Sequence, residues 1–340
     1  MKRFLTRLTL FLLVPLLGLT VLYFISDPYK TLKPFSLDYF DTTNRDYLSS
    51  ELFLMNYPER KYDSFIFGSS RGCGINTYHW AKYLPEGSSQ FLFQSWSETL
   101  TGIEQKISYI DRHGYPLNNA IVLIDIPGTF SDKQVPTAAL AIKDPSISGQ
   151  PRWKYQLTLL YDFIQKPSQW LRAIREMVRP RTTAIGFDVV SNDWNNDNGT
   201  VDLSVPPAKD CLDNMSKRAR EDFFNDLKGE ENVVKTSPPL IDRDLERQLR
   251  HMKETFERCG TDYKIVITPG YCYSYPAISG QDLEMLGLIF GTDNVFDYSG
   301  ENPLTMDYNN YSDPNHFGLR VGWYIIENIY NHLNLDELTQ

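Results

Sequence analysis

The chain contains few of the residues that build metal centres and disulfide frameworks. It has four cysteines and five histidines in 340 residues, and it has no C-x-x-C pair, which argues against a zinc site. An oxidising compartment would allow disulfides among Cys73, Cys211, Cys259 and Cys272. Cys259 and Cys272 flank one predicted strand and could pair with each other or with Cys211, and the sequence leaves the pairing open. We expect neither a metal ion nor a cofactor.

The chain also lacks the excess of positive charge that nucleic-acid-binding proteins need. Its net charge is −9 and its pI is near 5.2, so we expect no nucleic-acid partner. Internal repeats and low-complexity tracts are absent from the sequence. The length fits one large or two small domains, with ample material for a core.

One segment, Leu8 to Ile25, lacks charge altogether and is almost wholly apolar. As a helix it would extend about 27 Å, close to the thickness of a bilayer core. Lys2, Arg3 and Arg7 precede it, which predicts a cytoplasmic N-terminus. No small-x-small cleavage site follows, which favours an uncleaved anchor over a secretion signal. We therefore predict a transmembrane anchor over residues 1–26, with the main domain in the periplasm or cell exterior.

The rest of the chain alternates short apolar runs with helical patterns, starting from Phe65-Ile66-Phe67. Strands are predicted at 65–67, 90–93, 120–124, 263–268 and 294–297. Helices are predicted at 78–83, 100–110, 155–178, 240–259 and 319–333. Such alternation predicts an α/β fold with three α/β/α layers and a mostly parallel five-stranded sheet.

We expect three regions along the chain. The anchor at 1–26 precedes a juxtamembrane linker and short helix at 27–59, and a main domain follows at 60–335 with an insertion at about 150–235. Within the insertion, Asn198-Gly199 is a strong hairpin-turn signal. The surrounding acidic stretch resembles a calcium loop, but its glycine is one position late and Ser204 stands where the bidentate glutamate belongs, so a turn is favoured over a metal site.

Polar side chains gather where the predicted strands end. Ser70 follows the first strand, just beyond Gly68, and Asp313 and His316 lie three residues apart before the last helix. The carboxyl ends of parallel strands share one edge of a sheet, where open α/β sheets bind ligands. A histidine can take the proton of a serine hydroxyl, and a carboxylate can hold the imidazole in the required tautomer. The sequence therefore predicts a Ser70–His316–Asp313 catalytic triad.

Other polar residues at the same edge are candidates for binding substrate or the oxyanion. Ser95 and Ser97 follow the second strand, and Asp125 ends the third. Asp125 either lines the site or caps the following segment. Arg71 either clamps a substrate anion or forms a structural salt bridge with a nearby acid, and the second is favoured. Backbone N–H groups at the start of the helix after Ser70 could hold the oxyanion.

Two motifs carry a resemblance to a known family. Gly68-Ser69-Ser70-Arg71 after a strand, with Asp313-Pro314-Asn315-His316 before the final helix, resembles the SGNH/GDSL hydrolase superfamily. The closer likeness is to its membrane-anchored branch, which includes the D-alanyl transfer protein DltD and proteins of polysaccharide O-acetylation. The resemblance covers most of residues 60–335 and implies that Ser70 is the nucleophile, His316 the base and Asp313 its orienting acid.

The sequence departs from the superfamily at two blocks. Ser95-Trp96-Ser97 replaces a glycine that helps to bind the oxyanion, and Asp125-Ile126-Pro127 lacks the usual asparagine. The DltD-like branch often lacks both. The resemblance implies that an acyl group, with acetyl favoured, passes from an integral membrane O-acyltransferase to a polysaccharide or cell-wall polymer. The alternatives are an esterase or deacetylase acting on an acylated glycan, and a non-catalytic scaffold of an export or acylation complex.

Overall fold

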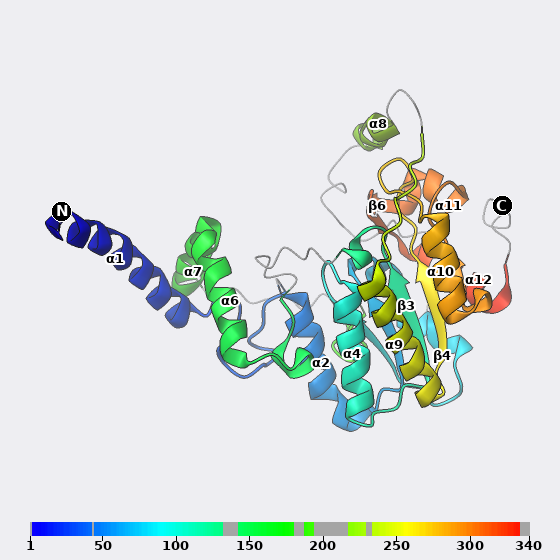
Figure 1. Cartoon of the computed structure of the whole chain (residues 1–340), viewed down its shortest axis with the longest axis horizontal. Helices are drawn as coiled ribbons and strands as arrows, with labels where there is room; N and C mark the ends of the chain where they lie inside the picture. The colour runs from blue at the N-terminus through cyan, green and yellow to red at the C-terminus, as the bar shows by residue number, and fades with distance from the viewer. Residues whose placement is uncertain are drawn as a thin grey trace. The chain divides into compact units, whose positions relative to one another are not determined.

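The computed structural model describes residues 2–42, 44–131, 142–179, 187–193, 217–228 and 233–333 (Figure 1). It divides the chain into a helical unit, Met1–Glu51 with Val135–Ile185, and a sheet unit, Leu52–Gln134 with Gly186–Gln340. The sequence predicts a main domain that starts at residue 60 and includes 135–149. Two segments that are far apart in the sequence instead form one helical unit.

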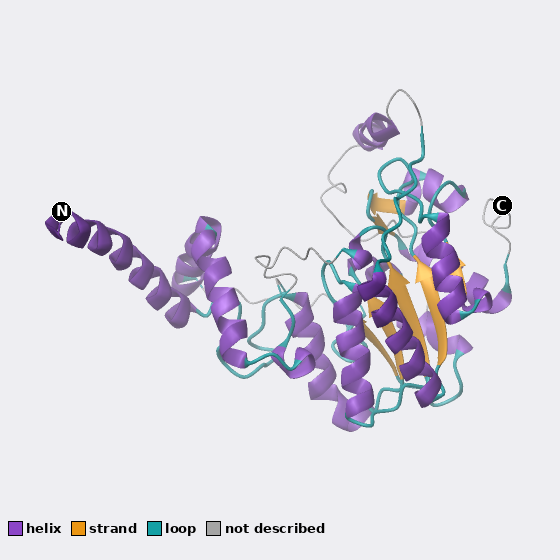
Figure 2. Cartoon of the chain, viewed as in Figure 1, coloured by secondary structure: helices purple, strands orange, loops and turns teal. Residues whose placement is uncertain are grey.

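The sheet unit contains a five-stranded, wholly parallel sheet, which confirms the predicted α/β class (Figure 2). The strand order is β2-β1-β3-β4-β5. The bounds are β1 (Ser64–Gly68), β2 (Gln90–Gln94), β3 (Asn119–Ile124), β4 (Asp262–Ile267) and β5 (Val295–Asp297). In register, Phe67 lies opposite both Phe93 and Val122, so these strands end at a common edge.

The helices of the sheet unit include several that the sequence analysis predicted. The longer ones are α4 (Leu100–Arg112), α8 (Lys217–Lys228), α9 (Arg243–Cys259), α10 (Gly280–Phe290) and α12 (Leu319–Asn331). The α-helices α3 (Thr77–Trp80) and α11 (Pro303–Met306) are single turns. The 3₁₀ turns are η1 (Ser70–Gly74), η2 (Ala81–Tyr83), η3 (Gly128–Phe130), η6 (Thr292–Asn294) and η7 (Tyr308–Asn310).

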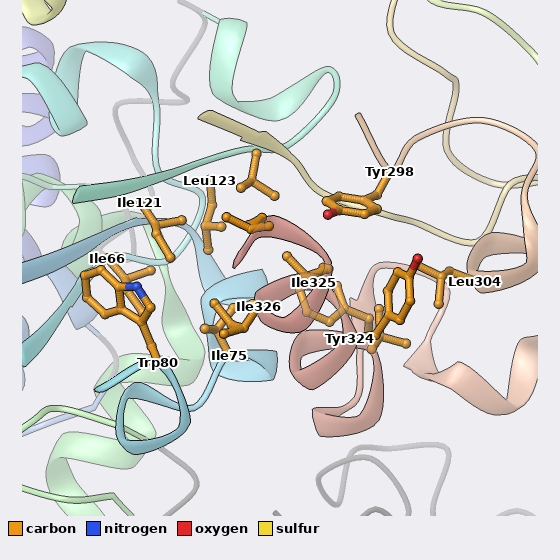
Figure 3. Close-up of a cluster of buried hydrophobic side chains, with 14 of the residues drawn as sticks. Ile66, Ile75, Trp80, Ile121, Leu123, Tyr298, Leu304, Tyr324, Ile325 and Ile326 are labelled. Atoms are coloured by element: carbon orange, nitrogen blue, oxygen red, sulfur yellow. The ribbon is translucent and has the colours of Figure 1, made fainter. Parts of the chain in front are cut away.

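Alternate residues of each strand serve opposite faces of the sheet, because successive strand side chains point to opposite sides. On one face, Phe65 packs near Phe53 from helix α2 (Arg45–Arg60), and α4 and α9 lie side by side (Figure 1). On the other face, Ile66 belongs to a buried cluster with Ile325 and Ile326 of α12 (Figure 3). The sheet is therefore covered on both sides, as three α/β/α layers require.

The predicted helix over 155–178 is two helices, α6 (Arg152–Gln165) and α7 (Pro167–Val178). Pro167 disfavours helical geometry at the residue before it, so the chain breaks at Lys166. The helical unit also contains α1 (Lys2–Ser26) and the turn α5 (Pro145–Ser148). In this unit α1 packs against α6 and α7.

The structure also bears on the predicted membrane anchor and on the pairing of the cysteines. In the part of the chain that the structure describes, no helix combines the length and apolar character needed to cross a membrane, and the anchor over 1–26 stays a prediction. Cys259 and Cys272 are free thiols, so they do not pair with each other. The Cys259 thiol instead lies 3.7 Å from an Asp111 carboxylate oxygen. Cys211 and the turn at Asn198-Gly199 lie outside the described residues.

Candidate active site

The structure brings Ser70, His316 and Asp313 into one hydrogen-bonded chain. Ser70 Oγ lies 2.8 Å from His316 Nε2, and His316 Nδ1 lies 2.7 Å from Asp313 Oδ2. Since an ionised carboxylate can only accept, Nδ1 carries the imidazole proton, and Nε2 is left to accept from the serine hydroxyl. The side chains of His316 and Asp313 are 31% and 23% exposed, so a substrate can reach the base. This arrangement is that of a serine nucleophile with its base and orienting acid.

Asp313 is held by its own loop. Strands β6 (Tyr311–Asp313) and β7 (His316–Phe317) form a small antiparallel pair around a tight turn. Asp313 Oδ1 accepts hydrogen bonds from the backbone N–H groups of Asn315 (2.7 Å) and His316 (3.0 Å). Burial alone raises the pKa of Asp313, but these N–H groups and the His316 ring outweigh it and hold that pKa below its usual value. Asp313 therefore stays ionised and keeps the tautomer fixed.

The backbone around Ser70 is held by close packing on glycines. Ser70 begins the 3₁₀ turn η1 directly after β1, and Ser69 caps that turn by accepting from the Arg71 N–H. A Cβ on Gly74 would lie 2.4 Å from the Phe317 ring, and a Cβ on Gly322 would lie 1.8 Å from the Gly74 carbonyl oxygen. Only glycine allows η1, β7 and α12 to approach this closely, and that approach sets the distance between Ser70 and His316.

Arg71 does not face the site as a free anion clamp. It is 2% exposed, and its Nε and Nη2 donate to Asn315 Oδ1 at 2.9 and 2.6 Å. Its Nη1 donates to Thr268 Oγ1 at 2.9 Å, and its Nε lies 3.8 Å from Asp125 Oδ1. Its guanidinium lies 4.7 Å from the centre of the Tyr275 ring. Arg71 thus ties η1 to the loop that carries His316, which agrees with the structural salt bridge favoured from the sequence.

Asp125 is buried inside the same network. Its carboxylate accepts from Thr268 Oγ1 at 2.6 Å and from the Ser69 hydroxyl. The side chain therefore neither caps the following segment nor presents a free carboxylate to a substrate. Instead it joins the ends of β3 and β4 to the residue beside the nucleophile.

Ser95 and Ser97 lie near the end of β2, but no hydrogen bond within the described ranges joins either to the triad. Ser95 is buried, and its N–H donates to the Gly68 carbonyl at 3.2 Å. Ser97 is exposed and adopts a positive φ of 49°. Ser95 thus fixes the end of β2 against β1. The structure does not connect Ser97 to the reacting groups.

The backbone N–H groups around Ser70 differ in whether they already donate a hydrogen bond. Those of Arg71 and Gly72 donate to Ser69, through its hydroxyl and its carbonyl. Among described residues, nothing accepts from the Ser70 N–H. Of the donors expected at the start of this helix, the nucleophile's own N–H is therefore the one able to hold an oxyanion.

Three residues of the site were not assigned a role from the sequence: Thr268, Asn315 and Tyr275. Thr268 follows β4 at the same edge as Ser70, and that position could have identified it. Asn315 lies within the Asp313–His316 motif, but its partner Arg71 is 244 residues away. No local pattern predicts such a pairing. A scan against models of protein families and a search of curated proteins each return no match for the chain.

Proposed function

We propose that the protein transfers an acyl group through a covalent intermediate on Ser70. The single observation that carries this is the hydrogen-bonded chain Ser70–His316–Asp313, with distances of 2.8 and 2.7 Å. The Ser70 Oγ–C bond forms as the hydroxyl proton passes to His316 Nε2. The bond between the acyl carbon and the departing group then breaks as His316 gives that group the proton. In the second half, His316 removes a proton from the acceptor hydroxyl, and the hydroxyl oxygen attacks the acyl carbon. The Ser70 Oγ–C bond breaks, and His316 returns the proton to Ser70 Oγ.

The acyl group that we propose is acetyl, and the acceptor is a hydroxyl of an exported polysaccharide or cell-wall polymer. This step depends on the motif likeness to the membrane-anchored SGNH branch, which also suggests an integral membrane O-acyltransferase as the donor. An anchor over residues 1–26 would place the domain at the outer face of the cell membrane. Its support is the uncharged run Leu8–Ile25 behind three basic residues. Anchoring would raise the effective concentration of the donor.

The experiment is to offer p-nitrophenyl acetate to the full chain and to follow acetyl-Ser70 by peptide mass spectrometry. Ser70→Ala should abolish acylation and leave the fold unchanged. Ser274→Ala is the matched control, since Ser274 is an exposed serine whose hydroxyl bonds to no other residue in the described ranges. Its backbone N–H donates to the Tyr271 carbonyl. Absence of acetyl-Ser70 in the wild type, or equal release of p-nitrophenol by Ser70→Ala, would overturn the proposal.

Hydrolysis is the second candidate, because the exposed edge of His316 also admits water. Adding oligosaccharides as acceptors distinguishes acyl transfer from hydrolysis. A transferase moves acetyl from Ser70 to the sugar faster than to water, whereas an esterase turns over without the sugar. A protein with no acetyl-Ser70 under either condition would be a scaffold.

A further inference from the structure

Helices α6 and α7 of the helical unit each carry an apolar stripe that no part of the described chain covers. On α6 the stripe has i, i+4, i+8 spacing, and on α7 it follows i, i+3, i+7, so each lies along one side of its helix. The exposed fractions are Trp153 67%, Leu157 55%, Tyr161 54%, Leu171 68%, Ile174 49% and Val178 76%. Such contiguous exposure on a helix marks an interaction surface.

These stripes are additional to the faces that hold the helical unit together. The inward face of α6 presents Tyr155, Leu159 and Phe163 to a buried cluster that also contains Tyr23 of α1 and Ala173 of α7. Both helices are therefore apolar on two sides. A helix of a water-soluble unit needs apolar residues only on the side that faces the core.

The exposed charges on these helices have one sign, although the whole chain has a net charge of −9. Arg152, Lys154 and Arg175 are exposed, and Arg179 follows directly after α7. The two acidic residues are already used. Asp162 is buried and accepts from the Tyr29 hydroxyl at 2.5 Å and from Lys166 Nζ at 2.6 Å. Glu176 accepts from Arg172 Nε at 2.9 Å. The solvent-facing charge of α6 and α7 is thus basic.

We propose that α6 and α7 lie on an anionic lipid bilayer, with their apolar stripes in the hydrocarbon boundary and their basic side chains at the headgroups. An amphipathic helix with aromatic and aliphatic residues on one side and Lys or Arg beside them has this chemistry. The same unit contains α1, whose exposed side chains Phe11, Leu17 and Ile25 extend the apolar surface. The basic residues favour an anionic lipid surface over a second copy joined through the same face, because the basic side chains of the two copies would then repel each other.

Trp153 provides the direct test. The full chain is reconstituted in vesicles of equal parts phosphatidylcholine and phosphatidylglycerol, some with brominated acyl chains, and the difference between wild type and Trp153→Phe isolates the emission of this residue. We expect brominated lipid to quench most of the Trp153 emission. Vesicles of phosphatidylcholine alone should quench it less, because the basic residues then lack anionic partners.

A triple variant tests the α7 stripe. Leu171→Gln, Ile174→Gln and Val178→Gln together should reduce the Trp153-specific quenching by about twofold or more, since each removes apolar area from the hydrocarbon boundary. The control triple changes exposed apolar residues of the sheet unit and should leave the quenching unchanged: Val233→Gln, Leu288→Gln and Met306→Gln. Circular dichroism checks that both triples fold.

Each contrary outcome overturns the proposal in a recognisable way. Unquenched Trp153 in a monomeric protein excludes the bilayer as the occupant. Unquenched Trp153 with cross-linked dimers assigns the stripes to a second copy. If Trp153 is shielded from a water-soluble quencher in native membranes but is not quenched by brominated lipid in vesicles, the stripes bind an integral membrane protein. Acylation of Ser70 is measured separately, so failure of this surface and failure of the catalytic proposal are distinguishable.

Discussion

Asn315→Ala tests whether the buried Arg71 network positions the catalytic histidine. Asn315 Oδ1 accepts from two nitrogens of Arg71, at 2.9 and 2.6 Å, and Asn315 immediately precedes His316. A hydrogen bond to a charged group contributes about 1.5–3 kcal/mol, so losing this acceptor should lower the free energy of unfolding by about 3 kcal/mol. Asp125 would remain 3.8 Å from Arg71 Nε, and Thr268 Oγ1 would still accept the hydrogen bond from Arg71 Nη1.

The catalytic consequence follows from geometry. Without Asn315 the turn that carries His316 loses its tie to η1, and a displacement of about 1 Å at a reacting group can cost about 100-fold in rate. We expect the acylation of Ser70 by p-nitrophenyl acetate to slow by about 10- to 100-fold, with little change in the substrate concentration at half-saturation. Asn315→Asp keeps an acceptor for Arg71 and should recover most of the rate.

The control is Asn309→Ala, since Asn309 is exposed and, among the described residues, its side chain donates only to Asp307. It should change neither stability nor rate. If Asn315→Ala lost stability but acylated Ser70 at the wild-type rate, Arg71 would be a structural residue only, and the positioning argument would be refuted.

Three further predictions follow from single side chains. Asp313→Asn should slow acylation by about 10⁴-fold, because the amide no longer fixes the Nδ1–H tautomer of His316; stopped-flow kinetics measures it. Burial and neighbouring carboxylates raise the pKa of Asp144 to about 7, so its protonated form stabilises the fold at low pH, and that contribution is lost as pH rises from about 4 through about 7. Calorimetry of Asp144→Asn should show a Tm gain over wild type that grows across this window. Gly322→Ala should cost about 3 kcal/mol and slow acylation, since its Cβ would meet the Gly74 carbonyl oxygen at 1.8 Å; denaturant titration measures the loss.

Control variants with the same type of substitution at exposed or open positions show whether these effects are specific to the sites named. Asp293→Asn and Asp38→Asn change exposed carboxylates and should leave acylation and the pH dependence of Tm as in wild type. Gly280→Ala places a Cβ where no atom lies within 4 Å, so it should be neutral or slightly stabilising. A flat Tm difference for Asp144→Asn, or a stable Gly322→Ala, would contradict the corresponding prediction.

The sequence predicts the central strands well because each contains a continuous apolar run that is buried on both faces. Phe65-Ile66-Phe67 and 120–124 are such runs, and they lie inside β1 and β3. Helix α10 was not predicted, since its two glycines and polar first turn weaken the helical pattern. The helical unit was not predicted either, because it depends on contacts between α1 and helices more than a hundred residues away.

The residues of the candidate site likewise include some that the sequence predicts and some that it does not. Ser70, Asp313 and His316 could be proposed from the sequence, since strand order places their segments at one edge of the sheet. The network of Arg71 with Asn315 and Thr268 could not, because its members come from separate elements and are joined only by side-chain geometry.

The central claim is that His316 makes Ser70 nucleophilic, and site-mapped labelling with a fluorophosphonate tests it most directly. The full chain is treated with the probe, digested and sequenced by mass spectrometry, alongside His316→Ala. We predict one modified serine, Ser70, with labelling lost in the variant. An unlabelled Ser70, or equal labelling without His316, would contradict the account.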